Sequence, residues 1–147
     1  MDNPRIVEIL LVEDNMRDAE LMIRALKQRN LANNLIHLKD GAEALDFLFN
    51  RGNYISSKKS DIPKIMLLDL KLPRVNGLEV LREIKTNEKF RAMAIVIVTS
   101  SAEDPDIKLA YELGANSYVV KPVNFDAFSE VMSNLGLYWL LINQYPG

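Results

Sequence analysis

The sequence predicts an α/β domain built on a doubly wound parallel sheet of five strands. The first reason is that short runs rich in Ile, Val, Leu and Met recur along the chain, and such apolar runs suit strands buried on both faces. The second is that stretches with helical spacing separate these runs, so strands and helices alternate. The third is the length of 147 residues, which suits one domain with one core.

Five apolar runs are expected to form the strands. They are IVEILLV from Ile6, LIHL from Leu35, IMLLDL from Ile65, AIVIVTS from Ala94 and the shorter SYVVKP from Ser117. Parallel strands need a crossover connection, so each interval between two runs is expected to carry a helix.

The remaining segments carry helix signals. Residues 16–29 place four apolar side chains on one helical face, namely Ala19, Met22, Ala25 and Leu26. Four later helices have start signals, namely Asp40 with Glu43 as a capping box, Asn76 with Gly77, Asp104 as an N-cap before Pro105, and Asn124 before Phe125. Gly114 is expected to end the helix that begins at Asp104. The polar residues 50–63 are expected to form an exposed loop.

The composition excludes several classes of protein. The net charge of -2 and the pI of about 5.5 leave no global basic field to hold a nucleic acid or an anionic membrane. The absence of cysteine excludes disulfides, thiolate metal sites and cysteine nucleophiles. The N-terminus lacks a basic segment and Glu8 interrupts its apolar run, so we expect a cytoplasmic protein without a signal peptide or membrane span.

Polar side chains follow the strands at their carboxyl ends, where open α/β sheets bind ligands. They are Glu13 and Asp14 after the first run, Asp69 in the third, Thr99 and Ser100 in the fourth, and Lys121 in the fifth. Three converging carboxylates repel one another unless a cation offsets their charge. Oxygen ligands of this kind suit Mg²⁺, so Glu13, Asp14 and Asp69 are predicted to form a magnesium site.

The same edge of the sheet is suited to phosphoryl transfer. A carboxylate can attack phosphorus and form an aspartyl-phosphate. The transfer then depends mainly on positioning and on positive charge around the phosphoryl oxygens. Lys121, the Thr99 hydroxyl and Mg²⁺ would supply these, and Asp69 is the candidate nucleophile because it stands alone at the end of a central strand.

Four motifs together resemble the receiver domain of two-component response regulators: LLVEDN, LLDLKLPRVNG, VIVTSS and YVVKP. The resemblance runs from about residue 6 to about residue 135 and leaves a C-terminal helix extension at about 136–147. It implies a (βα)5, flavodoxin-like or CheY-like fold. It also implies that Asp69 accepts a phosphoryl group from the phosphohistidine of a partner kinase, with Mg²⁺ held by Glu13, Asp14, Asp69 and the backbone carbonyl of Lys71.

The resemblance further implies a signalling switch rather than an enzyme with an external substrate. Lys121 would contact the phosphate, Thr99 would be the hydroxyl that moves toward it, and the rotamer of Tyr118 would follow Thr99. Pro122 would carry a cis bond. The expected output is a change in the surface of the fourth helix, fifth strand and fifth helix. Because the chain ends at Gly147, no output domain is expected.

The segment EDN, the long loop before the third strand and the closing GLYWLLINQYPG look like the stand-alone receivers that serve bacterial phytochrome histidine kinases. His37 is the single histidine. It lies in the second strand and is expected to be away from the acid cluster, as a structural or exposed side chain. The phosphodonor histidine is therefore expected in another protein.

The end of the chain suggests self-association. One helical stripe contains Phe128, Met132, Leu135, Trp139 and Ile142, and further apolar residues fall off that stripe. A helix that is apolar all round must bury a second face. We predict a homodimer through this final helix, with kinase docking or folding back over the same domain as alternatives.

Other interpretations of the site remain open at this point. Glu13 and Asp14 could be acids that complement the dipole of the following helix, and Tyr118 could be a packing residue. A haloacid-dehalogenase-type phosphatase also uses an aspartyl-phosphate with Mg²⁺. That class of enzyme needs a second acid two residues after the nucleophile, and the residue two positions after Asp69 is Lys71, which is not an acid. A flavodoxin-like electron carrier would need a first loop that holds phosphate, which EDNMRDAE would repel.

Overall fold

A computed structural model describes residues 7–28, 30, 34–55 and 62–121, together with Asp126 and Glu130. Its five strands form one sheet in the order β2-β1-β3-β4-β5, and every neighbouring pair is parallel. The strands are β1 (Ile9–Val12), β2 (Leu35–Leu38), β3 (Ile65–Leu68), β4 (Ala94–Thr99) and β5 (Ser117–Val120). The predicted doubly wound parallel sheet of five strands is therefore confirmed.

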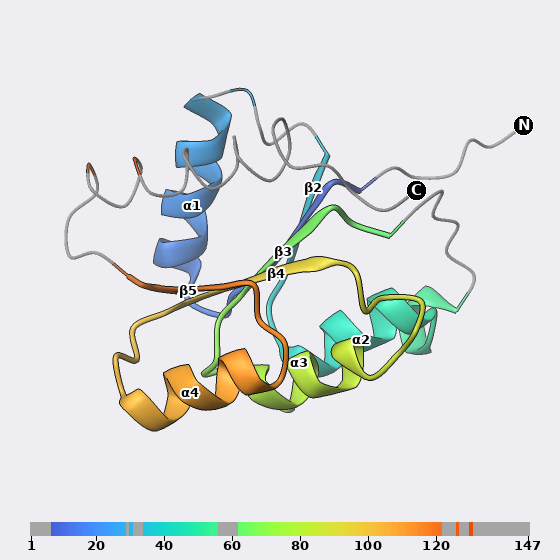
Figure 1. Cartoon of the computed structure of the whole chain (residues 1–147). Helices are drawn as coiled ribbons and strands as arrows, with labels where there is room; N and C mark the ends of the chain where they lie inside the picture. Colours follow the sequence, from blue (N-terminus) through green and yellow to red (C-terminus); the bar gives the residue numbers. More distant parts are fainter. Residues whose placement is uncertain are drawn as a thin grey trace, which may run out of the picture.

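The helices cover both faces of the sheet. Helix α1 (Met16–Gln28) lies on one face, and α2 (Gly41–Phe49), α3 (Gly77–Lys85) and α4 (Asp104–Glu112) lie on the other, as Figure 1 shows. Most of the predicted fifth helix, including Asn124 and Phe125 at its start, lies outside the described residues, and only Asp126 and Glu130, both helical, are described. Pro122 and the extension at 136–147 also lie outside the described residues. In the part of the chain that the structure describes, no helix is long and apolar enough to cross a membrane.

The alternation of side chains along each strand divides the core into two clusters. In β1, Ile9 and Leu11 pack toward α1, whereas Leu10 and Val12 pack toward the other three helices. The four apolar side chains predicted to lie on one face of α1, namely Ala19, Met22, Ala25 and Leu26, are all buried. In α3 the buried apolar side chains are Val80, Leu81 and Ile84. Each central strand is thus buried on both faces, which explains its continuous apolar sequence.

Two of the predicted helix caps are present. The Asp40 carboxylate accepts a hydrogen bond from the Glu43 N–H at 2.7 Å, and the Asn76 side chain accepts one from the Glu79 N–H at 3.0 Å. The Glu43 carboxylate accepts a hydrogen bond from the Tyr54 hydroxyl at 3.1 Å. These caps fix where α2 and α3 begin, beside the carboxyl ends of the strands.

The predicted N-cap of α4 is wrong by one residue. Glu103 is the N-cap, since its carbonyl accepts the first helical hydrogen bond from the Ile107 N–H at 3.1 Å. Asp104 and Pro105 therefore lie in the first turn, where a missing N–H costs nothing. Gly114 follows the helix with a φ of +109°, a left-handed conformation that favours glycine.

The connection at residues 50–63 is not wholly irregular. It contains the short 3₁₀ helix η1 (Gly52–Tyr54), and the Tyr54 ring packs edge-on against Phe47 with a centroid distance of 5.3 Å. Ile55 is 75% exposed, in agreement with the prediction of an exposed loop. Residues 56–61 lie outside the described part.

Candidate metal and phosphoacceptor site

The two acids after β1 differ in their environment. The Glu13 side chain is fully buried and Asp14 is exposed. The Glu13 N–H donates to the Leu38 carbonyl at 3.0 Å, which extends the pairing of β1 with β2 by one residue. Asn15 then caps α1, because its side-chain oxygen accepts a hydrogen bond from the Asp18 N–H at 3.0 Å.

Asp69 follows β3 directly. Its N–H donates to the Val12 carbonyl at 3.1 Å, and the residue is 7% exposed. The start of α3 packs against its backbone, since a Cβ atom on Gly77 would lie 2.2 Å from the Asp69 carbonyl oxygen. Glycine is thus required there for close approach, and the approach holds the Asp69 backbone in place.

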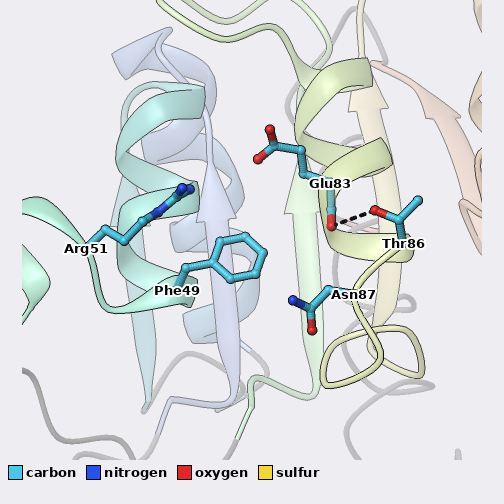
Figure 2. Close-up of a pocket in the computed structure, with 5 residues that line it drawn as sticks. All are labelled: Phe49, Arg51, Glu83, Thr86 and Asn87. Atoms are coloured by element: carbon cyan, nitrogen blue, oxygen red, sulfur yellow. Dashed lines mark hydrogen bonds between the residues drawn. The ribbon is translucent and has the colours of Figure 1, made fainter.

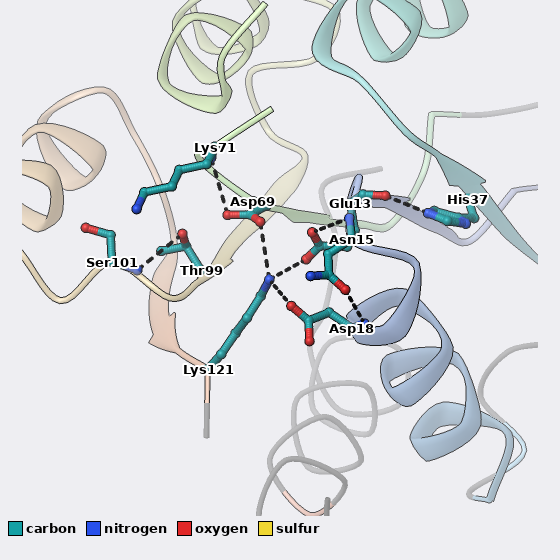
Figure 3. A network of polar contacts seen from close by, with 9 residues as sticks. All are labelled: Glu13, Asn15, Asp18, His37, Asp69, Lys71, Thr99, Ser101 and Lys121. Atoms are coloured by element: carbon teal, nitrogen blue, oxygen red, sulfur yellow. Dashed lines mark hydrogen bonds and ion pairs between the residues drawn. The ribbon is translucent and has the colours of Figure 1, made fainter. Parts of the chain in front are cut away.

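The structure brings the predicted acids together. Carboxylate oxygens of Glu13, Asp14 and Asp69 all lie within 4.8 Å of one another. The Lys121 ammonium lies 2.7 Å from Glu13 Oε1 and 3.2 Å from Asp69 Oδ2 (Figure 3). Thr99 is fully buried beside them, and its carbonyl accepts a hydrogen bond from the Lys121 N–H at 2.9 Å. The carboxyl ends of four strands, β1, β3, β4 and β5, therefore contribute to one site.

The charges of the site are strongly coupled. Burial and the neighbouring Asp69 raise the pKa of Glu13 to about 7, against the opposing effect of Lys121. Burial also opposes ionisation of Asp69, but the Thr99 hydroxyl, Glu13 and Lys121 outweigh it and hold the Asp69 pKa below its usual value. Burial opposes the charge on Lys121, but its carboxylate partners, first among them Asp18, raise its pKa. Asp69 is therefore ionised near neutral pH beside a charged lysine.

The oxygen donors fit a hard divalent cation. Within the described residues, Glu13 Oε1 is buried and makes no hydrogen bond of acceptable geometry, although the Lys121 ammonium lies close to it. An oxygen of this kind, beside two further carboxylates, suits a cation that prefers oxygen ligands. The Lys71 N–H donates to Asp69 Oδ1 at 3.3 Å, and the role of its carbonyl as a ligand remains a prediction.

Tyr118 lies over the connection from β4 to α4. Its hydroxyl donates to the Ser101 carbonyl at 2.8 Å, and its side chain packs against the core cluster below. The Ser101 hydroxyl donates to Asp106 in the first turn of α4 at 2.6 Å. Ser101 also lies next to the site, because its N–H donates to the Thr99 hydroxyl at 3.5 Å. A chain of contacts thus joins Thr99, Tyr118 and the start of α4.

The expectation that His37 is a structural side chain is confirmed, although its ring lies beside the backbone of the acid cluster and not away from it. Its Nε2 atom lies 2.8 Å from the backbone carbonyl of Glu13. A carbonyl only accepts, so Nε2 carries the proton. His37 pairs with Leu11 in the sheet, which brings its ring to the end of β1. This contact holds the backbone that carries the two acids.

Two other residues of the site were missed by sequence reasoning. Asp18 is an ion-pair partner of Lys121 at 2.7 Å, and Asn15 caps α1. The spacing Asn-x-x-Asp before an apolar stripe is a helix-start signal that could have revealed both.

A separate hollow lies at the other end of the molecule. It has a volume of about 240 Å³ and is lined by Phe49, Arg51, Glu83, Thr86 and Asn87, at the C-terminal ends of α2 and α3 (Figure 2). These helices run antiparallel to the strands, so the hollow faces the amino edge of the sheet. It contains none of the predicted site residues.

Comparison with known proteins places the chain in a family. The response regulator receiver domain family matches residues 9–133, and the chain belongs to this family. It is therefore a response regulator of the two-component signalling type, and receiver domains partner histidine kinases. The alternative of a haloacid-dehalogenase-type phosphatase is not supported.

Three relatives illustrate the similarity. The chain is 40% identical over 95% of its length to the probable methanogenesis regulatory protein FilR2 of Methanothrix harundinacea, of which it covers 87%. It is 37% identical over 90% of its length to response regulator Rcp1 of Synechocystis, covering 88% of that protein. The Mn²⁺-bound structure of Rcp1 superposes with a TM-score of 0.86 at 35% identity, covering 98% of this chain and 100% of Rcp1. The phosphorylated cyanobacterial phytochrome response regulator RcpA superposes with a TM-score of 0.87 at 30% identity, covering 99% and 100%.

Proposed function

We propose that this protein is a phosphorylation switch in which Asp69 accepts a phosphoryl group from the phosphohistidine of a partner kinase. One observation carries the proposal: Asp69, directly after the central strand β3, has two further carboxylates within 4.8 Å and the Lys121 ammonium at 3.2 Å. Nucleophile, cation ligands and phosphate partner are then present in one place. The phosphorylated state of the relative RcpA supports the assignment.

The residues around Asp69 account for the transfer. Asp69 is ionised, so a carboxylate oxygen can form a bond to phosphorus while the bond from phosphorus to the histidine nitrogen breaks. The Lys121 ammonium and the Thr99 hydroxyl would pair with phosphoryl oxygens and offset their charge. No external substrate is turned over, so the protein is a phosphoacceptor rather than an enzyme.

Glu13, Asp14, Asp69 and the Lys71 carbonyl would hold Mg²⁺. When bound, the ion supplies positive charge to the phosphoryl oxygens. The buried Glu13 oxygen and the mutual distances of the carboxylates support this ligand set, as does the Mn²⁺-bound state of Rcp1.

Phosphorylation would act on the rest of the molecule through Thr99 and Tyr118. Thr99 moves toward the phosphoryl group, and Tyr118 follows it, which alters the surface of α4, β5 and the fifth helix. The bond from Tyr118 to the Ser101 carbonyl and the bond from Ser101 to Asp106 support this route, because they join β5 to the first turn of α4.

The proposal extends to partners. The kinase would be a bacterial phytochrome, in line with the relative RcpA, a cyanobacterial phytochrome response regulator. This protein and its kinase would meet in the cytoplasm. Phosphotransfer from a purified phytochrome kinase tests this kinase assignment.

A homodimer would form through the final helix at residues 136–147. Sedimentation at micromolar concentration, with and without phosphorylation, tests the homodimer. A monomer in both states would contradict it.

The intact mass of the protein tests the phosphoacceptor. We expect wild type, incubated with acetyl phosphate and Mg²⁺, to gain the mass of one phosphoryl group, and Asp69→Asn to gain none. Asp104→Asn, an exposed acid in α4, is the matched control and should behave as wild type. Omitting Mg²⁺ should prevent the gain. No adduct on the wild type, or an equal one on Asp69→Asn, would contradict the assignment.

A further inference from the structure

The Lys121 ammonium has a third carboxylate partner that the proposed ligand set does not contain. Asp18 Oδ2 lies 2.7 Å from Lys121 Nζ, as close as Glu13 Oε1 and closer than Asp69 Oδ2 at 3.2 Å. The lysine side chain is 10% exposed and that of Asp18 27%, so water screens this pair only in part. The contact is therefore stronger than an ordinary surface ion pair.

Asp18 is held by helix α1 and not by a strand end. Its N–H donates to the Asn15 side chain at 3.0 Å, which fixes the first turn of the helix. The next residues toward the sheet, Ala19 and Met22, are each 1% exposed and anchor α1 in the core. The Asp18 carboxylate thus reaches the site from a rigid element, on the side away from Thr99 and Ser101 (Figure 3).

The partners of Lys121 fall into two classes. Glu13 and Asp69 belong to the group of carboxylates that could hold a cation, whereas Asp18 does not. An ammonium ion and a divalent cation compete for Glu13 and Asp69, because both neutralise the same charges. When a cation binds the oxygens of Glu13 and Asp69, the Lys121 ammonium can remain paired with Asp18.

We propose that Asp18 is a positioning residue that holds the Lys121 ammonium on the α1 side of the site, so that Glu13 and Asp69 can bind a divalent cation. The proposal rests on the function assigned to the site above. It predicts that Asp18 affects cation affinity only through Lys121, since Asp18 binds the lysine ammonium and is not itself a ligand of the cation.

Binding of Mn²⁺ alone, measured by titration calorimetry at pH 8, tests this role in a double-mutant cycle. We expect Asp18→Asn to weaken Mn²⁺ binding about five-fold, because the ammonium is then left with Glu13 and Asp69 only. Lys121→Gln should strengthen binding, because the competitor is gone. Adding Asp18→Asn to Lys121→Gln should change the affinity less than two-fold.

Two further variants act as controls. Asp18→Glu keeps the carboxylate and should restore most of the affinity. Glu20→Gln removes one charge from an exposed position of the same helix and should leave Mn²⁺ binding within two-fold of wild type. Thermal unfolding of each variant without metal shows that it is folded.

Equal weakening by Asp18→Asn with and without Lys121 would overturn the proposal, since it would mean that Asp18 acts by long-range charge or by stabilising α1. No weakening at all would overturn it too. Neither result bears on Asp69, because the mass of the wild type after acetyl phosphate treatment reports phosphorylation separately.

Discussion

At the scale of single residues, His37 makes a hydrogen bond whose contribution to stability can be measured directly. Its Nε2–H donates to the Glu13 carbonyl at 2.8 Å, and that carbonyl ends the strand that carries the acids. His37→Leu should lower the free energy of unfolding by about 1 kcal/mol, because it leaves a partly buried carbonyl without its donor. Urea denaturation at pH 8 measures the loss.

The matched variant is His37→Gln, whose amide can donate in place of the ring. It should recover part of the lost stability. If His37→Leu and His37→Gln are equally unstable, ring packing and not the hydrogen bond accounts for the role of His37.

The residues that could be predicted are those whose position follows from the end of a strand. Glu13, Asp14, Asp69, Thr99 and Lys121 each follow or end an apolar run, and parallel strands bring their carboxyl ends to one edge. His37 and Asp18 could not be found in this way. Their side chains reach the site across a sheet pairing and from a helix, and these contacts depend on three-dimensional geometry.

At the scale of elements, the cap of α2 is the feature to test. The Asp40 carboxylate accepts from the Glu43 N–H at 2.7 Å and also pairs with Arg74 at 3.4 Å. Asp40→Ala should lower the free energy of unfolding by about 1 kcal/mol, because an N–H of the first turn loses its acceptor. Asp40→Asn should lose only a few tenths, since the amide oxygen still caps.

Arg74→Gln separates the two contacts of Asp40. It removes the ion pair and leaves the cap, and the Arg74 side chain is 64% exposed, so we expect little change in stability. Thermal unfolding compares the three variants. A larger loss for Arg74→Gln than for Asp40→Ala would show that the ion pair, and not the cap, stabilises this corner.

The elements were predicted more reliably in their interiors than at their ends. The runs LIHL and AIVIVTS identify β2, which is mostly half-buried, and β4, which is buried throughout. The run from Ile6 is longer than β1, which begins at Ile9. The N-cap of α4 falls on Glu103 and not Asp104, because the carbonyl that opens the hydrogen-bond ladder decides the boundary. The pattern of side chains in the sequence does not show which backbone carbonyl accepts the first helical hydrogen bond.

At the scale of the whole molecule, the acid cluster links stability to pH. The pKa of Glu13 is about 7 in the folded protein and 4.5 as a free group. Between these values the native state holds a proton that the unfolded chain has lost, so Glu13 contributes stability that is full below pH 4.5 and is lost as the pH rises through 7. Asp69 has a lowered pKa, so its contribution is lost only at more acidic pH.

The metal-free protein should therefore lose roughly 2 to 3 kcal/mol of unfolding free energy between pH 5 and pH 8. Glu13→Gln cannot titrate and should flatten this part of the profile. Urea denaturation across the range, in the presence of a chelator, compares the two proteins. An equally steep profile in Glu13→Gln would assign the pH dependence to other groups.

A divalent cation should reverse the destabilisation that three converging carboxylates cause above pH 7. Mg²⁺ binds the folded state and not the unfolded chain, so at 100 times its dissociation constant it should add about 2.7 kcal/mol to the free energy of unfolding. For a chain of this length that corresponds to a rise in melting temperature of roughly 5 to 10 °C.

Asp14 is the ligand best suited to testing this linkage, because its side chain is exposed and its removal leaves no cavity. Asp14→Ala should remove the response to Mg²⁺ and leave the metal-free protein as stable as wild type or more so, since one of three repelling charges is gone. Asp104→Ala, an exposed acid far along the chain in α4, should keep the full response. A melting temperature that rises equally with Mg²⁺ in Asp14→Ala would place the cation elsewhere, and would leave the buried Glu13 oxygen to be neutralised by Lys121 alone.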